Sequence, residues 1–167
     1  VFLDDLENVD SAYGREIIKS FVLGGSGLPT AGVGALTEAL GARIENVHLN
    51  SPVESLSQFE GKKIIIATDA AKAGQLLGRN DEVSTVSSVT WYHSVPTGLI
   101  SSQRLRVTSA VSPLVNSIAI SNVVSQYAPS EKTLISSTSL HPVSDNDVVD
   151  EIAKFWGIAS TDLELIK

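Results

Sequence analysis

The side chains that could do chemistry are scattered along this chain of 167 residues, and their spacing fits few reactions. The histidines His48, His93 and His141 are far apart, and none has a second histidine at helical spacing, so we expect no metal site. Serine is abundant, but no Gly-x-Ser-x-Gly elbow occurs, and the serines are interpreted as strand and turn residues. The sequence therefore leaves the catalytic residues unknown.

A glycine-rich stretch at residues 32–37 could in principle cradle a phosphate. Gly32-Val33-Gly34 supplies two of the three glycines of a dinucleotide fingerprint, but a helix and Pro29 precede it where a buried strand should stand. We interpret the glycines as a turn followed by a tightly packed helix start. No glycine loop is followed by Lys-Ser or Lys-Thr, so the sequence contains no P-loop.

An aromatic stretch offers the remaining candidates for a ligand pocket. Trp91, Tyr92 and His93 are consecutive in a predicted strand and are candidates for the lining of a substrate cavity. Successive residues of a strand point to opposite faces, so at most one of Trp91 and Tyr92 faces any cavity. Phe155 and Trp156, in the last predicted helix, are interpreted as core residues.

Composition limits the class of protein. Hydrophobic residues make up 43% of the chain and charged residues 19%, which is typical of a globular fold. The net charge of -7 argues against binding to nucleic acid or to an anionic membrane surface. No apolar run approaches the roughly 18 residues of a membrane span. No signal-peptide pattern stands at the N-terminus, and a cytoplasmic location is expected.

Two further features of composition concern redox chemistry and completeness. The chain has no cysteine, so disulfides, thiolate metal sites and cysteine nucleophiles are excluded. It also has no methionine, not even at position 1. Val1 is therefore either a processed terminus or a cut inside a longer protein, and we expect the second.

In the first half, the pattern predicts helices and short strands in alternation. Helices are expected at residues 10–23, with Asp10 as the cap, and at residues 34–40. Strands are expected at residues 43–50 and 53–56, and a strand covered on both faces at residues 62–68. Asp69 then caps a third helix, which runs through Leu77.

In the second half, segments rich in Val, Ile, Thr and Ser predict a sheet of about four strands. The expected strands are residues 84–95, 105–111, 117–125 and 134–140. Ser144 opens a last helix, which Gly157 ends, and Asp147 forms a variant of the capping box with Ser144. The predicted class is α+β, with a mixed or antiparallel sheet of about four to six strands flanked by helices.

Several of these stretches, taken in order, resemble one known family. They are Val1-Phe2-Leu3-Asp4, Gly27-Leu28-Pro29-Thr30-Ala31-Gly32, Asn50-Ser51-Pro52-Val53, Ile66-Ala67-Thr68-Asp69-Ala70, Tyr127-Ala128-Pro129 and the helix end Trp156-Gly157. In this order the chain is similar to the middle of FAD-dependent amine oxidase-like oxidoreductases, in the branch of phytoene desaturase and protoporphyrinogen oxidase.

The resemblance implies three segments and one cofactor. Residues 1–27 would be a helical lead-in of the substrate domain, residues 28–78 a remnant of the FAD domain, and residues 79–167 the substrate-binding sheet with its C-terminal helix. Val53 corresponds to the valine whose backbone approaches the adenine end of FAD, and Pro29 and Gly32 correspond to a turn near the substrate cavity. The family's phosphate-gripping loop and C-terminal segment are expected in missing parts of the parent chain.

Two functions remain open at this point. The first is a fragment of a flavin oxidoreductase that is inactive alone and whose parent oxidises a small apolar or amine substrate. The alternative is a self-standing α+β ligand- or protein-binding domain with no redox activity. A piece cut from a larger fold exposes apolar surface, so we expect self-association, with the stretch from Ile64 to Ala67 as the adhesive region.

Overall fold

The computed structural model describes residues 7, 9–25, 27–79, 85–108 and 112–167. The chain forms two compact units, one of Val1–Ala39 with Val86–Lys167 and the other of Leu40–Thr85. The predicted division into residues 1–27, 28–78 and 79–167 stays a prediction.

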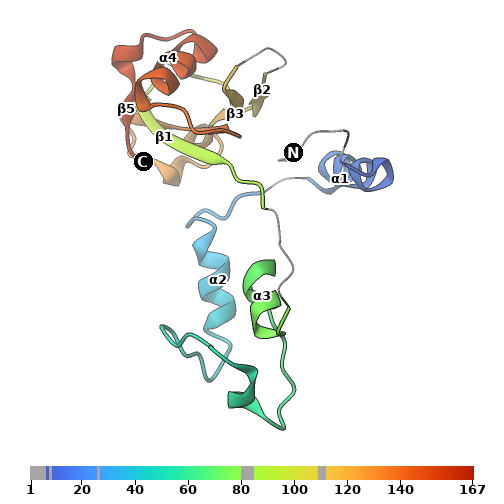
Figure 1. Cartoon of the computed structure of the whole chain (residues 1–167). Helices are drawn as coiled ribbons and strands as arrows, with labels where there is room; N and C mark the ends of the chain where they lie inside the picture. The colour runs from blue at the N-terminus through green and yellow to red at the C-terminus, as the bar shows by residue number, and fades with distance from the viewer. Residues whose placement is uncertain (1–6, 8, 26, 80–84, 109–111) are drawn as a thin grey trace. The chain divides into compact units, whose positions relative to one another are not determined.

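Helices and strands follow one another in an order that matches the α+β class predicted from the sequence (Figure 1). The helices are α1 (Ser11–Gly24), α2 (Gly34–Gly41), α3 (Ala70–Leu76) and α4 (Asp145–Trp156). The strands are β1 (Val89–Pro96), β2 (Arg106–Val107), β3 (Leu114–Ala119), β4 (Lys132–Ser139) and β5 (Glu164–Leu165). Short 3-10 turns are η2 (Leu56–Phe59), η3 (Ile120–Asn122), η4 (Ser125–Tyr127) and η5 (Ser160–Asp162).

The five strands form one antiparallel sheet in the order β2-β3-β4-β1-β5. The long pair β1 and β4 runs in register from Val89 opposite Ser139 to Pro96 opposite Lys132. Along β4 every second residue is buried, which is the period-two pattern of a strand with one face on a core. The sheet has two distinct faces as a result.

One face of the sheet packs against α4 (Figure 1). On α4, Val148, Ile152 and Trp156 follow one another at four-residue spacing, so they form one apolar stripe along the helix. The buried core comprises Trp91, Val95, Ile100, Leu114, Ala119, Ile135, Val148, Ile152 and Trp156. The indole Nε1 of Trp156 donates to Ser117 Oγ at 2.8 Å, and Ser117 Oγ lies 2.8 Å from Ser137 Oγ. These hydrogen bonds satisfy polar groups that the core would otherwise leave unpaired.

Both ends of α4 are capped as the sequence predicts. Ser144 Oγ accepts from the backbone N–H of Asp147 at 3.2 Å, which confirms Ser144 as the cap, and it donates to Asp147 Oδ2 at 2.6 Å. Gly157 adopts φ +71° and donates its N–H to the Ala153 carbonyl at 2.8 Å. A residue with a Cβ would be strained there, so glycine ends the helix.

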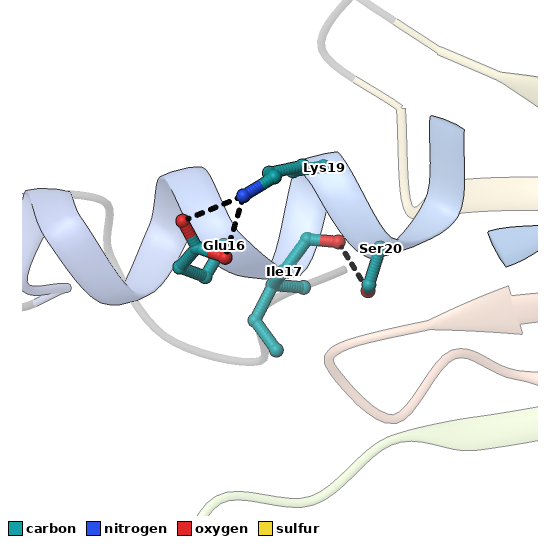
Figure 2. Close-up of polar contacts among 4 residues, drawn as sticks. All are labelled: Glu16, Ile17, Lys19 and Ser20. Carbon is teal, nitrogen blue, oxygen red and sulfur yellow. Dashed lines mark hydrogen bonds and ion pairs between the residues drawn. The ribbon is translucent and has the colours of Figure 1, made fainter. Parts of the chain in front are cut away.

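Helix α1 begins where predicted, because Asp10 Oδ1 accepts from the backbone N–H groups of Ala12 and Tyr13 at 3.0 and 2.9 Å. Figure 2 shows two further contacts on this helix. Lys19 pairs with Glu16 at 3.4 Å, and Ser20 Oγ donates to the Ile17 carbonyl at 2.7 Å. These exposed contacts stabilise the helix only weakly.

In the second unit, the predicted strands at residues 43–50, 53–56 and 62–68 are wrong, because the structure contains no strand there. A strand needs a neighbour to accept and donate its backbone hydrogen bonds, and no described segment pairs with these residues. The stretch expected to be covered on both faces is open instead, and Ile65 is 92% exposed. The helix after Asp69 is confirmed as α3, with Asp69 Oδ1 accepting from the Lys72 N–H at 2.8 Å.

The first unit, Val1–Ala39 with Val86–Lys167, contains the sheet, and we call it the sheet unit. All four strands predicted in it exist, with shifted ends. The expected strand at 105–111 is two residues long in its described part, and residues 109–111 lie outside the described residues, as does residue 84 of the first expected strand. The expected strand at 117–125 begins earlier and gives way to η3 and η4. The sequence did not predict β5, a pair of residues held against β1.

A pair of matched substitutions tests the core. Ile135→Ala removes a fully buried side chain, so the free energy of unfolding should fall by about 2–5 kcal/mol. Ile166→Ala makes the same change at a residue that is 57% exposed, and should cost less than about 1 kcal/mol. Urea unfolding followed by tryptophan fluorescence measures both, because Trp91 and Trp156 lie in the core. Equal losses for the two variants would contradict the assignment of this core.

Candidate functional site

The consecutive residues Trp91, Tyr92 and His93 divide between the two faces of the sheet. Trp91 is 6% exposed and belongs to the core beneath α4, and His93 is fully buried. Tyr92 is 36% exposed and points to the opposite face. Of the three predicted cavity residues, Tyr92 therefore has the most accessible side chain, and the expectation that at most one of Trp91 and Tyr92 faces a cavity agrees with this geometry.

Strand register places other side chains beside Tyr92. One row across the sheet joins Tyr92, Ser136 and Ile118, and the next joins Thr90, Thr138 and Asn116. The hydroxyls of Thr90 and Thr138 lie 3.1 Å apart. We call these six residues the Tyr92 face. It mixes an aromatic ring, one aliphatic side chain, three hydroxyls and an amide, and its members other than Tyr92 are half-buried. Such a surface can contact an apolar body and orient it with a few hydrogen bonds.

The last residues of the chain, which include β5, pair with β1 and form one edge of the sheet. Lys132 Nζ donates to Glu164 Oε2 at 2.9 Å, and Ser94 Oγ donates to the same oxygen at 3.2 Å. The hydrogen bond and the charge of Lys132, followed by the hydrogen bond from Ser94, lower the pKa of Glu164. The backbone of Tyr92 exchanges hydrogen bonds with residues 166 and 167, so Tyr92 lies between two hydrogen-bonded neighbours.

The predicted turn at Pro29 and Gly32 is present. The Gly32 N–H donates to the Pro29 carbonyl at 3.0 Å, and Gly32 adopts φ +85°, where glycine is favoured. The same carbonyl accepts a hydrogen bond of 2.7 Å from the hydroxyl of Tyr127, which is 98 residues further along the chain. The stretch Tyr127-Ala128-Pro129 contributed to the family resemblance, but this bond was not predicted. A single tyrosine carries no sequence signal for a hydrogen-bond partner so far away in the chain.

Val53 lies in the second unit and lines an open hollow of about 490 Å³. The hollow is lined by Val53, Leu56, Phe59, Lys62, Lys63, Ile64, Ile65, Ile66, Ala67, Thr68, Lys72 and Leu76. Among the described residues, the backbone N–H and C=O of Val53 have no hydrogen-bond partner. Both groups are therefore available to a ligand. The predicted role of Val53 in cofactor binding stays a prediction.

In the part of the chain that the structure describes, no group of three or more His, Asp or Glu side chains could hold a metal ion. Within residues 7, 9–25, 27–79, 85–108 and 112–167, no helix has both the length and the apolar character that crossing a bilayer requires.

His93 is the most unusual titratable group of the sheet unit. It is fully buried, and neither Nδ1 nor Nε2 has a hydrogen-bond partner among the described residues. Burial lowers the pKa of His93 below its ordinary value, and the negative charge of Asp145 opposes this effect only in part. The neutral imidazole is therefore the form that the folded chain holds.

This lowered pKa predicts that the fold loses stability in mild acid. Below about pH 6.5 the histidine of the unfolded chain takes up a proton while buried His93 stays neutral, so the unfolded state binds more protons. The free energy of unfolding should fall with pH there, by at most about 1.4 kcal/mol per pH unit from this residue. Chemical denaturation at pH 7.5, 6.5 and 5.5 measures the slope.

Two variants isolate the contribution of His93. His93→Leu should flatten the dependence on pH, while His48→Leu, at an exposed position, should leave it unchanged. An NMR titration of the unchanged chain gives the pKa of His93 directly and does not depend on whether either variant folds. A pKa of His93 at or above 6.5 would contradict the buried neutral imidazole.

Comparisons with known proteins identify no relative of this chain. No family model matches the sequence, and neither a curated protein nor a solved structure is significantly similar to it.

Proposed function

We propose that this chain is the central part of a FAD-dependent oxidoreductase of the amine oxidase-like family, in the branch of phytoene desaturase and protoporphyrinogen oxidase. In this proposal the sheet unit is the substrate-binding domain, and the longer protein oxidises a small apolar or amine substrate. The chain by itself is inactive, since the phosphate-gripping loop of the family is not in its sequence.

The observation that carries the proposal is the hydrogen bond between Tyr127 and Pro29. These two residues belong to separate stretches that resemble the same family, one at the start of the predicted segment 28–78 and one in the predicted segment 79–167. Stretches that resemble a family only by chance have no reason to meet. A 2.7 Å bond between them is what a common origin would produce, because each stretch would then have its place in one cavity wall.

Val53 supports the assignment of the cofactor. The resemblance assigns this residue a backbone contact with the adenine end of FAD, and such a contact needs an unpaired N–H and C=O at an accessible position. Val53 meets both requirements, since its backbone has no partner among the described residues and it lines an open hollow. When bound, FAD would supply the hydride chemistry, which none of the residues identified here can supply.

Tyr92 is the residue that we propose for substrate contact. Its ring lies on the accessible face, beside Ile118 and Ser136, and offers an apolar surface with a polar tip. Trp91 and His93, buried on the opposite face of β1, would have only a structural role, because they fix the position of the strand on which Tyr92 lies. The protein's part in the reaction is then to bind and orient the substrate and to keep water away from it.

Flavin binding tests this function. A longer protein that contains this chain, purified without added cofactor or after incubation with FAD, should show the yellow absorbance of bound flavin. The 167-residue chain alone should bind FAD no tighter than roughly the millimolar range, because it lacks the loop that grips the phosphates. A longer protein that shows no flavin absorbance after incubation with FAD would rule the proposal out.

Self-association is expected from the same proposal. The apolar stretch at residues 64–67 would be covered by the rest of the FAD domain in the longer protein, so the chain alone should associate at high concentration. Light scattering after size exclusion should show a mass that rises with concentration, and Ile65→Asp should abolish the rise. The matched control is Val107→Asp, at a residue of the sheet unit that is 73% exposed. A clean monomer at high concentration would count against this expectation.

A further inference from the structure

The hollow in the second unit combines an apolar lining with positive charge. Most of its lining is aliphatic or aromatic, including Leu56, Phe59 and the three isoleucines at residues 64–66. Lys62, Lys63 and Lys72 complete it, and the lining contains no acidic residue. The charge of the lining residues themselves is therefore opposite in sign to the net charge of -7 of the whole chain.

The three lysines of the hollow differ from others in the chain in their pairing. Lys19, Lys132 and Lys154 each form an ion pair with a glutamate. Within the described residues, no ion pair involves Lys62, Lys63 or Lys72. Three unpaired cations beside one apolar surface favour a partner that carries negative charge on an apolar body.

We propose that this hollow binds an amphipathic anion, meaning an apolar chain or ring that ends in a carboxylate or a phosphate. The apolar body would lie against Phe59 and the isoleucines, and the head group would be held by the ammonium groups of the lysines. A volume of about 490 Å³ is within the range of small-molecule sites. Lysine is a common phosphate ligand, and it binds through charge rather than through a fixed fork geometry, so it accepts either head group.

This proposal goes beyond the flavin function and does not depend on it. A self-standing binding domain would use the hollow in the same way. Val53 is proposed to contact the adenine end of FAD, whose phosphates would be held by a loop elsewhere in the longer protein. In the present proposal, the lysines of the hollow itself bind the anionic head group. The test uses the 167-residue chain, in which the hollow is open, and not the longer protein, in which the FAD domain would cover residues 64–67, so failure of one proposal leaves the other untouched.

The test is a titration of the full 167-residue chain with four probes, at a protein concentration at which it is monomeric. Octanoate and octyl phosphate share an apolar chain and differ in the anionic head. Octylammonium has the same chain with a positive charge, and inorganic phosphate has the charge without the chain. Backbone NMR shifts locate each probe, and their dependence on concentration gives its affinity.

Octanoate, octyl phosphate or both should shift residues 53–76 with a dissociation constant below roughly 1 mM. Octylammonium and inorganic phosphate should bind at least tenfold more weakly. The better of the two anions identifies the head group. Equal binding of octylammonium would show a merely apolar groove and would overturn the proposal, as would shifts that map outside residues 53–76 or no binding of either anion.

Lysine variants separate specific charge from net charge. Replacing Lys62, Lys63 and Lys72 together by glutamine should weaken anion binding at least tenfold at low salt. The matched control replaces Lys19, Lys154 and Lys167 by glutamine, which changes net charge equally, and it should bind as the unchanged chain does. Circular dichroism checks that both variants are folded. Equal weakening in the two variants would overturn the role of the three lysines.

Discussion

The packing of α4 on one face of the sheet is the interaction on which the described structure depends. Val148, Ile152 and Trp156 bury their side chains against β1, β3 and β4, and nearly all of the buried apolar residues belong to this single contact. Hydrophobic burial is the largest stabilising contribution to a fold of this size. The face that α4 covers determines which side chains of β1 are buried. Trp91 and His93 lie on the covered face, and Tyr92 lies on the other.

The enclosed face contains a polar network as well as apolar side chains. Ser117 and Ser137 face each other across β3 and β4, and the indole of Trp156 donates into this pair. Arg106 lies over the face of the same indole, with its guanidinium carbon 4.3 Å from the ring centroid. Trp156 is therefore held by a hydrogen bond and a cation–π contact in addition to burial, which fixes the orientation of α4 on the sheet.

The elements predicted correctly from the sequence are those whose signals are local. Asp10, Asp69 and Ser144 each begin a helix through a hydrogen bond to a backbone group two or three residues ahead, and Gly157 ends one through its own conformation. The Val- and Thr-rich segments of the second half find partners in each other and form strands. Residues 62–68 have an equally strong strand composition but no neighbouring strand, so they form no ladder of backbone hydrogen bonds. Composition can predict that a segment prefers a sheet, but not that a sheet is present beside it.

The candidate sites show the same limit. Alternation along β1 predicted that Trp91 and Tyr92 lie on opposite faces of the sheet. Which of the two is buried depends on the face that α4 covers, and no local sequence pattern predicts that face. The lysines of the hollow gave no signal as site residues, because a pair of lysines before an apolar run is usually a solvated strand start. What distinguishes them is that three lysines without an ion pair line one apolar hollow together, with no acidic residue in the lining.

The two units differ in what stabilises them. Among the described residues between 40 and 79 none is buried, whereas the sheet unit has a continuous core. A unit without buried side chains offsets little of the entropy of ordering its chain, so we expect it to gain stability from a partner or ligand. Backbone amide hydrogen exchange measures this dependence directly. The account predicts strong protection in β1, β3 and β4, weak protection across residues 40–79, and an increase in the latter when octanoate or octyl phosphate is added. Equal protection in both units without any ligand would contradict it.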